Sequence, residues 1–452
     1  MRLRKTITTI VATAILLAGW QLFAVIANQP ELIPSLPRLV RTLCEWLVSG
    51  SFYQSVGATI LRGVLGMSIS FVCAIGMAGL FARFEWVYEL FRPLLAIMRS
   101  IPVISFILLA LIFLNPESIP LMIAFLTMFP LLTENLTRGI LELRPGLSIM
   151  ARQFHIRRSN VLFQIIYPQL KPFLYSGLAS ATGFGWRAII MGEVLSQCAF
   201  GIGSEMKRAQ NFIAVPELLA WTIVAVFISF FFDKGISKVA DITPKISFAN
   251  EDQTIPTPTL SVLDTKDISY QYGIQHFSHS FQKGIIYGIS APSGKGKTTL
   301  LNLIGGILLP TEGEIHPTRH FGIATIFQQP QLLPYLTAEE NIILPLSSFL
   351  TEEKARRIAQ KHLQEMEMEP FGNRYPKELS YGQQQRIAIA RALAYPSPLL
   401  LMDEPFKGLD EALSHRIIER IREKQMKEER IILFTSHNPD EIRLLADEVI
   451  YL

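Results

Sequence analysis

Cysteine and charge are both scarce in this sequence of 452 residues. The three cysteines, Cys44, Cys73 and Cys198, show no CxxC or Cys/His spacing, which excludes a disulfide-rich secreted domain and a cysteine-based metal site. Charged residues make up 18% of the chain against a usual ~25%. Hydrophobic residues reach 50%, which excludes disorder and disfavours an ordinary cytosolic enzyme.

The two halves of the chain differ in composition. Residues 1–245 hold 21 Lys and Arg against 12 Asp and Glu, a net charge of +9, whereas residues 246–452 hold 21 against 26, a net charge of −5. All five Trp lie in the first half. This asymmetry predicts one part that faces an apolar solvent and one part that faces water.

The first half contains six apolar runs. A helix of about 20 apolar residues crosses the ~30 Å hydrocarbon layer of a bilayer. The first run alone also fits a secretory signal peptide, and a single short run also fits a buried helix of a soluble core, but six together favour an all-α membrane domain with six transmembrane helices. The runs are Thr6–Asn28, Gly63–Ala82, Ser100–Pro116, Ser118–Thr133, Pro172–Gln197 and Leu218–Phe232.

Positive charge predicts the orientation of these spans, because cytoplasmic loops near span ends carry extra Lys and Arg. The loop after the fourth run holds five Arg between residues 138 and 158 against the single acid Glu142, and Lys234, Lys238 and Lys245 follow the sixth. Arg38 and Arg41 in the first external loop are a mild exception. We expect both ends of a multi-pass protein of the cytoplasmic (inner) membrane to lie in the cytosol.

Residues 241–259 differ from both halves. This segment has three prolines, mixed charge and no sustained period, which predicts a flexible linker. About 20 residues reach roughly 25 Å as a random coil. The expected organisation is a transmembrane domain over residues 1–240, a linker over 241–259 and a soluble cytosolic domain over 260–452.

The soluble domain opens with a pattern that predicts phosphate binding. A strand-like stretch, 288–290, precedes APSGKGKTT at 291–299, and an apolar helical run follows. Backbone N–H groups at a helix N-terminus cradle a triphosphate when glycines let the backbone approach, while Lys297 reaches the β/γ oxygens and Thr298 binds Mg²⁺. Ala291 replaces the first glycine of the pattern and would cost about 1 kcal/mol at a positive φ. The residues expected to bind nucleotide here are Ser293, Gly294, Gly296, Lys297, Thr298 and Thr299.

A second nucleotide element follows the apolar run 399–402. Asp403 and Glu404 end this run, which predicts a buried parallel strand with two acids at its carboxyl end, where α/β sheets bind ligands. Asp403 suits Mg²⁺, and Glu404 is placed to polarise the attacking water. In isolation, two acids that solvate a strand end would be an equally fair interpretation.

Between these elements lies LSYGQQQR at 379–386, followed by the helical IAIARALA. With its motifs in this order, the region 260–452 resembles the nucleotide-binding domain of ATP-binding cassette (ABC) proteins. The resemblance implies an α/β phosphate-loop domain with a helical signature subdomain, ATP hydrolysis, and ATP and Mg²⁺ as cofactors. Tyr381 stands where the usual signature has its first glycine, and Lys407 and Gly408 replace common small residues.

The resemblance also implies roles for individual residues. Tyr270 competes with Tyr272 for the adenine-stacking position. For His437 alone, a surface imidazole would be the plainer interpretation. The implied roles are adenine stacking by Tyr272, Mg²⁺ binding by Thr298, Gln328 and Asp403, catalysis by Glu404, Gln328 and His437, contact with the opposite subunit's nucleotide by Ser380, Gly382 and Gln383, and a subunit-crossing loop at Asp410.

Each composite ATP site in this family needs the phosphate loop of one subunit and the signature of another. The chain has one of each, so the resemblance implies a homodimer or a paired half-transporter. We expect no nucleic-acid partner.

The basic loop after the fourth run resembles the cytoplasmic coupling loop of binding-protein-dependent importers. The spacing follows the importer pattern, with Ala151, Ile165 and Pro168 in the expected places, whereas Ile149, Met150, His155 and Tyr167 replace the usual Glu, Ala, Gly and Leu. The residues expected to take part in coupling are Ala151, Phe154, His155 and Pro168. Such a loop packs short helices into a groove of the ATPase and transmits its closure to the spans. A basic amphipathic loop on anionic membrane lipid is the alternative.

Together with residues 183–206, the first half resembles a type I importer permease of the nitrate/sulfonate/taurine type, working with an external solute-binding protein. Arg187 and Glu193 are ionisable within a predicted span and are candidates for the solute pathway. They lie about 600° apart around a helix and therefore need different partners. The predicted function is ATP-driven import of a small solute, with an anion as one candidate; the alternatives are an exporter or a membrane-anchored mechanotransmitting ATPase.

Overall fold

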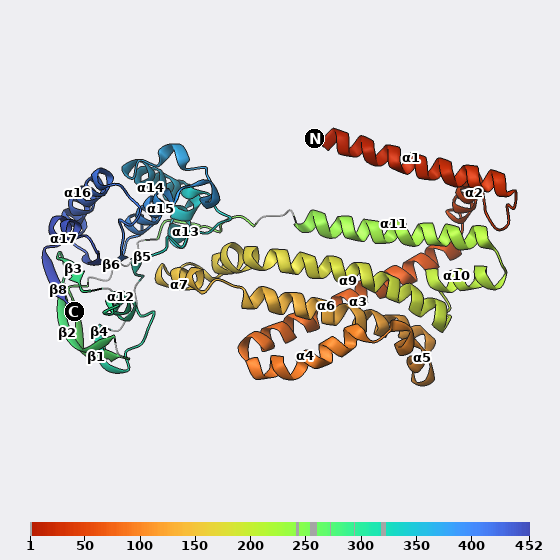
Figure 1. Ribbon diagram of the computed structural model, residues 1–452, viewed down its shortest axis with the longest axis horizontal. Coiled ribbons are helices and arrows are strands. Elements are labelled where there is room, and N and C mark those ends of the chain that lie inside the picture. The colour runs from red at the N-terminus through yellow and green to blue at the C-terminus, as the bar shows by residue number, and fades with distance from the viewer. Residues whose placement is uncertain (1, 241–243, 254–259, 272, 293, 318–321) are drawn as a thin grey trace. The chain divides into compact units, whose positions relative to one another are not determined.

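The computed structural model divides the chain into two compact units (Figure 1). It describes residues 2–240, 244–253, 260–271, 273–292, 294–317 and 322–452, without the side chains of residues 2–6, 9 and 10. Unit 1 comprises Met1–Leu143 and Gln169–Thr243, and unit 2 comprises Arg144–Pro168 and Pro244–Leu452. The segment 144–168, which lies between two predicted spans, therefore belongs to the same unit as the soluble domain.

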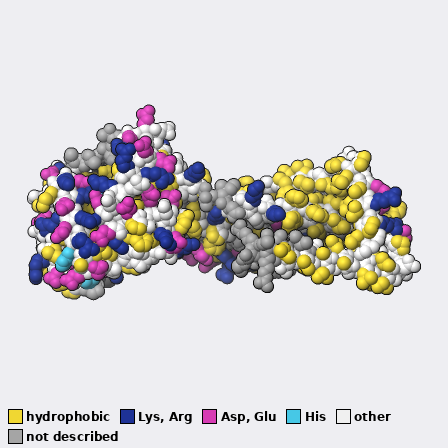
Figure 2. All heavy atoms as spheres, turned by 90° about the horizontal axis from the view of Figure 1, so that it is seen from above, with side chains coloured by type: hydrophobic (Ala, Val, Ile, Leu, Met, Phe, Trp, Pro, Cys, Tyr) yellow, Lys and Arg dark blue, Asp and Glu magenta, His cyan; other side chains and the backbone are white. Residues whose placement is uncertain are grey.

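The regular elements of unit 1 among its described residues are all helices. Large hydrophobic side chains cover its surface in Figure 2, whereas charges of both signs cover unit 2. A protein surface of this kind is stable in lipid and costly in water. Its elements are α1 (Arg2–Ala27), α2 (Leu36–Trp46), α3 (Gly50–Arg83), α4 (Glu85–Ser100), α5 (Val103–Phe113), the short 3₁₀ helix η1 (Pro116–Ser118), α6 (Ile119–Leu141), α9 (Tyr167–Ser196), α10 (Ile202–Asn211) and α11 (Val215–Ala240).

Three helical stretches among the described residues are long and apolar enough to cross a membrane. They are Gly50–Arg83, Pro116–Leu141 and Val215–Ala240, and the bent pair formed by α4 and α5 would make a fourth. Each of the six predicted runs overlaps a helix, but the six-span count goes beyond these three or four stretches.

The predicted span Ser100–Pro116 corresponds to the second half of a bent helix pair. The helix there is the 11-residue α5, which follows α4 after a bend of 94°. Pro102 lies at the break and Ile101 is extended, because the proline ring disfavours helical backbone in the residue before it.

Small residues pack α3 against α6. A Cβ atom added to Gly66 would lie 2.6 Å from the Cβ of Ala124, and Ser70, Ala74 and Ala78 on the same side of α3 are buried. Small side chains at such positions let helix backbones approach closely, which is how membrane helices gain packing energy without a hydrophobic drive.

Unit 2 is an α/β domain with a helical part. A parallel sheet has the strand order β5-β6-β7-β3-β8, and a three-stranded antiparallel sheet has the order β2-β1-β4. The parallel strands β3, β6 and β7 are buried on both faces, as their continuous apolar sequences predict. The strands are β1 (Val262–Tyr270), β2 (Ile274–Gln282), β3 (Ile286–Ser290), β4 (Glu312–His316), β5 (Ala324–Ile326), β6 (Leu399–Asp403), β7 (Ile431–Thr435) and β8 (Glu448–Tyr451).

Helices surround these sheets, and one group forms the predicted helical subdomain around α13, α14 and α15. The segment 144–168 adds α7 (Pro145–Gln153), α8 (Arg158–Asn160) and a π-helical turn, η2 (Val161–Ile166). The other helices are α12 (Lys297–Ile304), α13 (Ala338–Leu346), α14 (Glu352–Glu365), the 3₁₀ turns η3 (Glu369–Phe371) and η4 (Pro376–Glu378), α15 (Tyr381–Ala394), α16 (Glu411–Glu428) and α17 (Pro439–Leu445).

The described part of the predicted linker, residues 244–253, is docked on unit 2 rather than free. The backbone N–H groups of Ala249 and Gln253 donate to the carbonyl oxygens of Ser347 and Phe349 at 3.1 and 2.9 Å. Asp252 accepts from the backbone N–H of Thr351 at 2.9 Å. Residues 241–243 and 254–259 of the predicted linker lie outside the described residues.

Asn160 ties residues 244–253 to the segment 144–168. Its side-chain amide donates to the Ser247 carbonyl and the Ser347 hydroxyl, both at 2.8 Å, and its carbonyl oxygen accepts from the Ser247 N–H at 2.9 Å. The side chain is 1% exposed. Gln164 adds a hydrogen bond to the Pro244 carbonyl at 3.1 Å. Residues 244–253, the segment 144–168 and the C-terminal end of α13 are thus held together within one unit.

We expect Asn160→Ala to weaken the attachment of residues 244–253 to the rest of unit 2. The change removes the two hydrogen bonds to the Ser247 backbone and the one to the Ser347 hydroxyl, at a cost of about 1–3 kcal/mol in total. Hydrogen–deuterium exchange of residues 244–253 should rise, whereas Arg158→Ala, at an exposed neighbouring position, should leave it unchanged. Equal exchange in the two variants would contradict the assignment.

Candidate functional site

The carboxyl ends of β3, β6 and β7 bring three loops together at one edge of the parallel sheet. The loop after β3 carries the predicted phosphate loop, the loop after β6 carries Asp403 and Glu404, and the loop after β7 carries His437. Parallel α/β sheets bind ligands at this edge. Sequence motifs more than 100 residues apart therefore meet as predicted.

The phosphate loop ends on α12. Gly294 and Gly296 have φ values of +81° and +90°, which other residues rarely adopt, and a Cβ on Gly296 would lie 2.6 Å from the Gly273 carbonyl oxygen. The expected penalty at Ala291 does not arise, because its φ is not positive. Ser293 lies outside the described residues.

Lys297 folds back over its own loop. Its ammonium group donates to the Ala291 carbonyl at 2.7 Å and lies 3.5 Å from Nδ1 of His437. The side chain is 8% exposed. A buried cation whose partners are neutral fits the phosphate group of a nucleotide. Thr299, two residues on, is half-buried.

Asp403 is held by two hydroxyl groups. Thr298 Oγ1 donates to one carboxylate oxygen at 2.9 Å and Thr435 Oγ1 donates to the other at 2.7 Å. Burial raises the pKa of Asp403 above its ordinary value, while the hydrogen bonds from Thr435 and Thr298 oppose that shift. A buried carboxylate beside a threonine hydroxyl supplies the hard oxygen ligands that Mg²⁺ prefers. The residues Thr298 and Asp403 therefore fit a magnesium ion.

Glu404 is the centre of the polar contacts at this edge. Its Oε1 lies 3.1 Å from Nε2 of His437 and accepts from Nε2 of Gln328 at 3.4 Å, and its Oε2 lies 3.3 Å from Nζ of Lys407. The backbone φ of Glu404 is +48°. Non-glycine residues in this region cost of order 1 kcal/mol or more and concentrate at functional sites. The structure thus brings the three predicted catalytic residues together and adds Lys407.

The signature residues begin α15. Ser380 caps this helix, because its hydroxyl accepts from the Gln383 N–H at 3.3 Å while the Gln383 side chain accepts from the Ser380 N–H at 2.9 Å. Asp410 likewise caps α16 by accepting from the Leu413 N–H at 2.9 Å. Ser380 is exposed and Gly382 is half-buried. Tyr272, the predicted adenine-stacking residue, lies outside the described residues.

The predicted coupling segment packs into the core of unit 2. Phe154 is fully buried, its ring meets the ring of Tyr395 edge-on at 5.2 Å, and the guanidinium of Arg391 lies 5.4 Å from its centroid. Ala151 is also buried there. Burial lowers the pKa of His155 below its ordinary value. Pro168 is half-buried near the start of α9.

Gln153 and Arg391 make buried hydrogen bonds that the sequence did not reveal. Gln153 donates to the Gly305 carbonyl at 2.7 Å and accepts from the Ile323 N–H at 2.8 Å through its backbone. Arg391 is 1% exposed and donates to the carbonyls of Pro330 and Gln331, both at 2.9 Å. Burial lowers its pKa to about 9. Both look like ordinary helix residues in the sequence, and only their buried environment distinguishes them.

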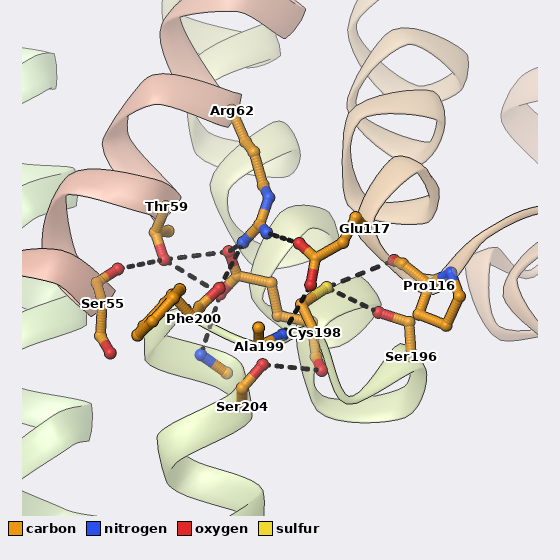
Figure 3. A network of polar contacts seen from close by, with 12 residues as sticks. Ser55, Thr59, Arg62, Pro116, Glu117, Ser196, Cys198, Ala199, Phe200 and Ser204 are labelled. Atoms are coloured by element: carbon orange, nitrogen blue, oxygen red, sulfur yellow. Dashed lines mark hydrogen bonds and ion pairs between the residues drawn. The ribbon is translucent and has the colours of Figure 1, made fainter.

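In unit 1, Glu193 belongs to a polar network that includes Thr59, Arg62 and Glu117, which are labelled in Figure 3. It accepts from Arg62 at 2.7 Å, from Thr59 at 3.0 Å and from the Gly203 N–H at 2.9 Å, and its side chain is 0% exposed. Arg62 also pairs with Glu117 at 2.6 Å. The network joins α3, η1, α9 and α10.

Arg187, in contrast to the buried Glu193, is exposed. It lines a cavity of about 720 Å³ formed by α5, α9, α10 and α11, together with Asp233 at the far end of α11. Most of the other lining side chains are apolar, among them Met191, Met206 and Phe230. Arg187 and Glu193 therefore have different surroundings, as their spacing predicts.

These loops define a phosphate-loop nucleotide-binding domain, and comparisons with known proteins give its family. Residues 274–407 match the family model "ABC transporter", and residues 68–233 match "Binding-protein-dependent transport system inner membrane component". The uncharacterized ABC transporter ATP-binding protein MJ0796 of Methanocaldococcus jannaschii is 34% identical over 201 residues, which cover 40% of this chain and 85% of that protein.

A further relative and a solved structure of MJ0796 are similar over the same half. The Fe(3+) ions import ATP-binding protein FbpC of Rhizobium etli is 35% identical over 189 residues, and the chain spans 54% of its length. A solved structure, the dimeric post-hydrolysis state of the MJ0796 cassette bound to ADP and Pi, is 32% identical, with 42% of this chain and 94% of that chain covered and a TM-score of 0.40.

The chain belongs to the ABC transporter family. It carries a membrane-type permease domain and an ATP-binding domain in one polypeptide, and it binds and hydrolyses ATP.

Proposed function

We propose that this protein imports a small solute across the cytoplasmic membrane at the expense of ATP, with its ATPase domain in the cytosol. The observation that carries the proposal is the packing of segment 144–168, which joins α6 and α9 of unit 1, into the core of the ATPase unit through Phe154. Closure of the ATPase then moves this segment as a rigid body. The match of residues 68–233 to a binding-protein-dependent permease supports import with an external solute-binding protein.

In this proposal the side chains promote hydrolysis by positioning the attacking water and the phosphates, and none of them forms a covalent bond with the nucleotide. Glu404 accepts a proton from the attacking water, and His437 and Gln328, both within 3.4 Å of its carboxylate, orient that water and the γ-phosphate. Lys297 binds the β/γ oxygens. Thr298, Asp403 and Gln328 would hold Mg²⁺, which neutralises phosphate charge when it is bound.

The unit of function in this proposal is a pair of chains. One phosphate loop and one signature occur in the sequence, so Ser380, Gly382 and Gln383 of one chain complete the ATP site of the other, with Asp410 in the crossing loop. The dimeric cassette structure of MJ0796 supports this arrangement. A homodimer supplies two permease domains of six spans each.

For the solute we propose the nitrate/sulfonate/taurine class. Arg187, exposed in the apolar cavity of unit 1, is a cation that an anionic solute can meet on its path. Glu193 is buried in an ion pair with Arg62, so we propose that it does not meet the solute itself but holds the helices around the pathway in place.

Uptake in sealed vesicles tests this function. The full chain is reconstituted with ATP in the lumen, and taurine, nitrate and an alkanesulfonate are supplied outside with the binding protein encoded beside this gene. Accumulation that needs both ATP and binding protein supports import. In vesicles loaded with the same solutes, extrusion supports an exporter, and ATP hydrolysis without flux of any tested solute in either direction supports a mechanotransmitting ATPase.

We expect Lys297→Ala to weaken ATP binding roughly 10- to 100-fold, because charge-assisted contacts of about 1.5–3 kcal/mol to the phosphates are lost. Titration with a fluorescent ATP analogue measures the change. Lys295→Ala, at an exposed position two residues away, is the matched control and should bind normally. Unchanged affinity in the Lys297 variant would remove this residue from the site.

A further inference from the structure

Three positions where this chain departs from the cassette pattern lie beside one another in unit 2. Tyr381 replaces the first glycine of the signature, and Lys407 and Gly408 replace small residues of the loop before Asp410. The sequence offers no reason for any of them, because they are separated by about 26 residues.

The ring of Tyr381 lies against Gly408. A Cβ atom on Gly408 would be 2.8 Å from Cδ1 and 3.2 Å from Cε1 of Tyr381, so a side chain at 408 would collide with the ring. Gly408 also has a φ of +80°, which disfavours other residues. The tyrosine in the signature and the glycine in the loop therefore fit each other.

The hydroxyl group of Tyr381 reaches a third loop. It donates to the backbone carbonyl of Gln328 at 2.8 Å. The side chain of Gln328 donates in turn to Glu404, and the other oxygen of Glu404 faces Lys407, the neighbour of Gly408. Each residue of this set thus contacts the next, and the last contacts the first; the order is Tyr381, Gln328, Glu404, Lys407 and Gly408.

The Gln328 loop is held from the same helix at a second point. Arg391, ten residues after Tyr381 on α15, donates to the carbonyls of Pro330 and Gln331. Gln331 has a φ of +44°, a conformation that needs surrounding contacts to persist. The two ends of this loop segment, 328 and 331, are thus bound by opposite parts of α15.

We propose that Tyr381 is a positioning residue for hydrolysis: it places Gln328 beside Glu404 and ties the signature of a subunit to the hydrolytic residues of the same subunit. Because the signature faces the partner's nucleotide in the proposed pair, Tyr381 is a direct connection between the two ATP sites. This inference rests on the proposed roles of Glu404 and Gln328.

The test uses the full chain in lipid nanodiscs and measures kcat and KM for ATP, so it needs no solute. Tyr381→Phe keeps the ring against Gly408 and removes only the hydroxyl. We expect kcat to fall about three- to tenfold, the effect of one lost positioning hydrogen bond, with KM unchanged within about twofold. Tyr335→Phe is the matched control, since that exposed tyrosine makes no hydrogen bond through its hydroxyl among the described residues.

Two double mutants separate positioning from a general structural effect. In a Gln328→Ala background, Tyr381→Phe should cause no further loss of kcat, because the side chain that it places is gone. Gly408→Ala should lower kcat strongly in the parent chain, where the new Cβ collides with the ring of Tyr381. In a Tyr381→Gly background the loss should be clearly smaller, because the steric clash is relieved although the positive φ remains.

The inference would be overturned if Tyr381→Phe had the kcat of the parent chain. It would also be overturned if Tyr381→Phe lowered kcat by the same factor in the parent chain and in the Gln328→Ala background. A similar loss for Gly408→Ala in both backgrounds would overturn the packing argument. If Glu404→Gln is inactive in the same assay while Tyr381→Phe behaves like the parent chain, the inference fails and the proposed function stands.

Discussion

Replacing Glu404 by Gln should reduce ATP turnover by about 100-fold or more while ATP still binds. Glutamine preserves the shape of the side chain and its contact with Gln328, but it removes the proton acceptor, and general base catalysis typically contributes 10²–10⁴-fold. Single-turnover hydrolysis and nucleotide binding, measured on the same preparation, separate the two steps.

Glu411→Gln is the matched control for this prediction. Glu411 is an exposed acid at the start of α16, seven residues away, and its loss should leave kcat unchanged. Near-normal hydrolysis by the Glu404 variant would show that another group accepts the proton.

Replacing Phe154 by Ala should separate hydrolysis from transport. The ring is fully buried between Tyr395 and Arg391, and truncation of a buried phenylalanine typically costs 3–5 kcal/mol of packing. The catalytic residues do not contact this ring, so we expect ATP hydrolysis to continue while uptake per ATP falls at least about tenfold. Both quantities are measured in the vesicles described above.

Phe163→Ala provides the comparison within the same segment. Phe163 lies in η2 and is 48% exposed, so its loss opens no cavity in the core. Equal loss of uptake in the two variants would show that the segment responds to any truncation and would contradict a specific coupling role for Phe154.

The phosphate site could be predicted because its parts are local. Within nine residues, two glycines allow the left-handed backbone, a lysine supplies charge and a threonine supplies a hydroxyl, and each requirement can be seen in the order of residue types. The cost that a positive φ would have imposed on Ala291 does not apply, because the φ of Ala291 is not positive, whereas those of Gly294 and Gly296 are.

The bend near Pro102 and the docked linker could not be predicted in the same way. The apolar run 100–116 does not reveal that its helix turns away from the preceding helix α4, and the direction taken after Pro102 depends on what the helices pack against. Residues 244–253 have the composition of a flexible tether. Their order comes from Asn160, Ser347 and Thr351, which lie far away in the chain.

The residue types and their spacing were sufficient to establish an apolar helical half, a phosphate-loop ATPase half and the loops that carry the chemistry, because helix propensity, hydropathy and turn geometry act over short stretches of chain. Pairings such as Arg62 with Glu193 across 131 residues, Asn160 with Ser347 across 187 and Tyr381 with Gln328 across 53 became known only from the folded chain. The reason is physical: a buried polar group must find a partner, and which of many equivalent side chains becomes that partner depends on the packing of the whole unit.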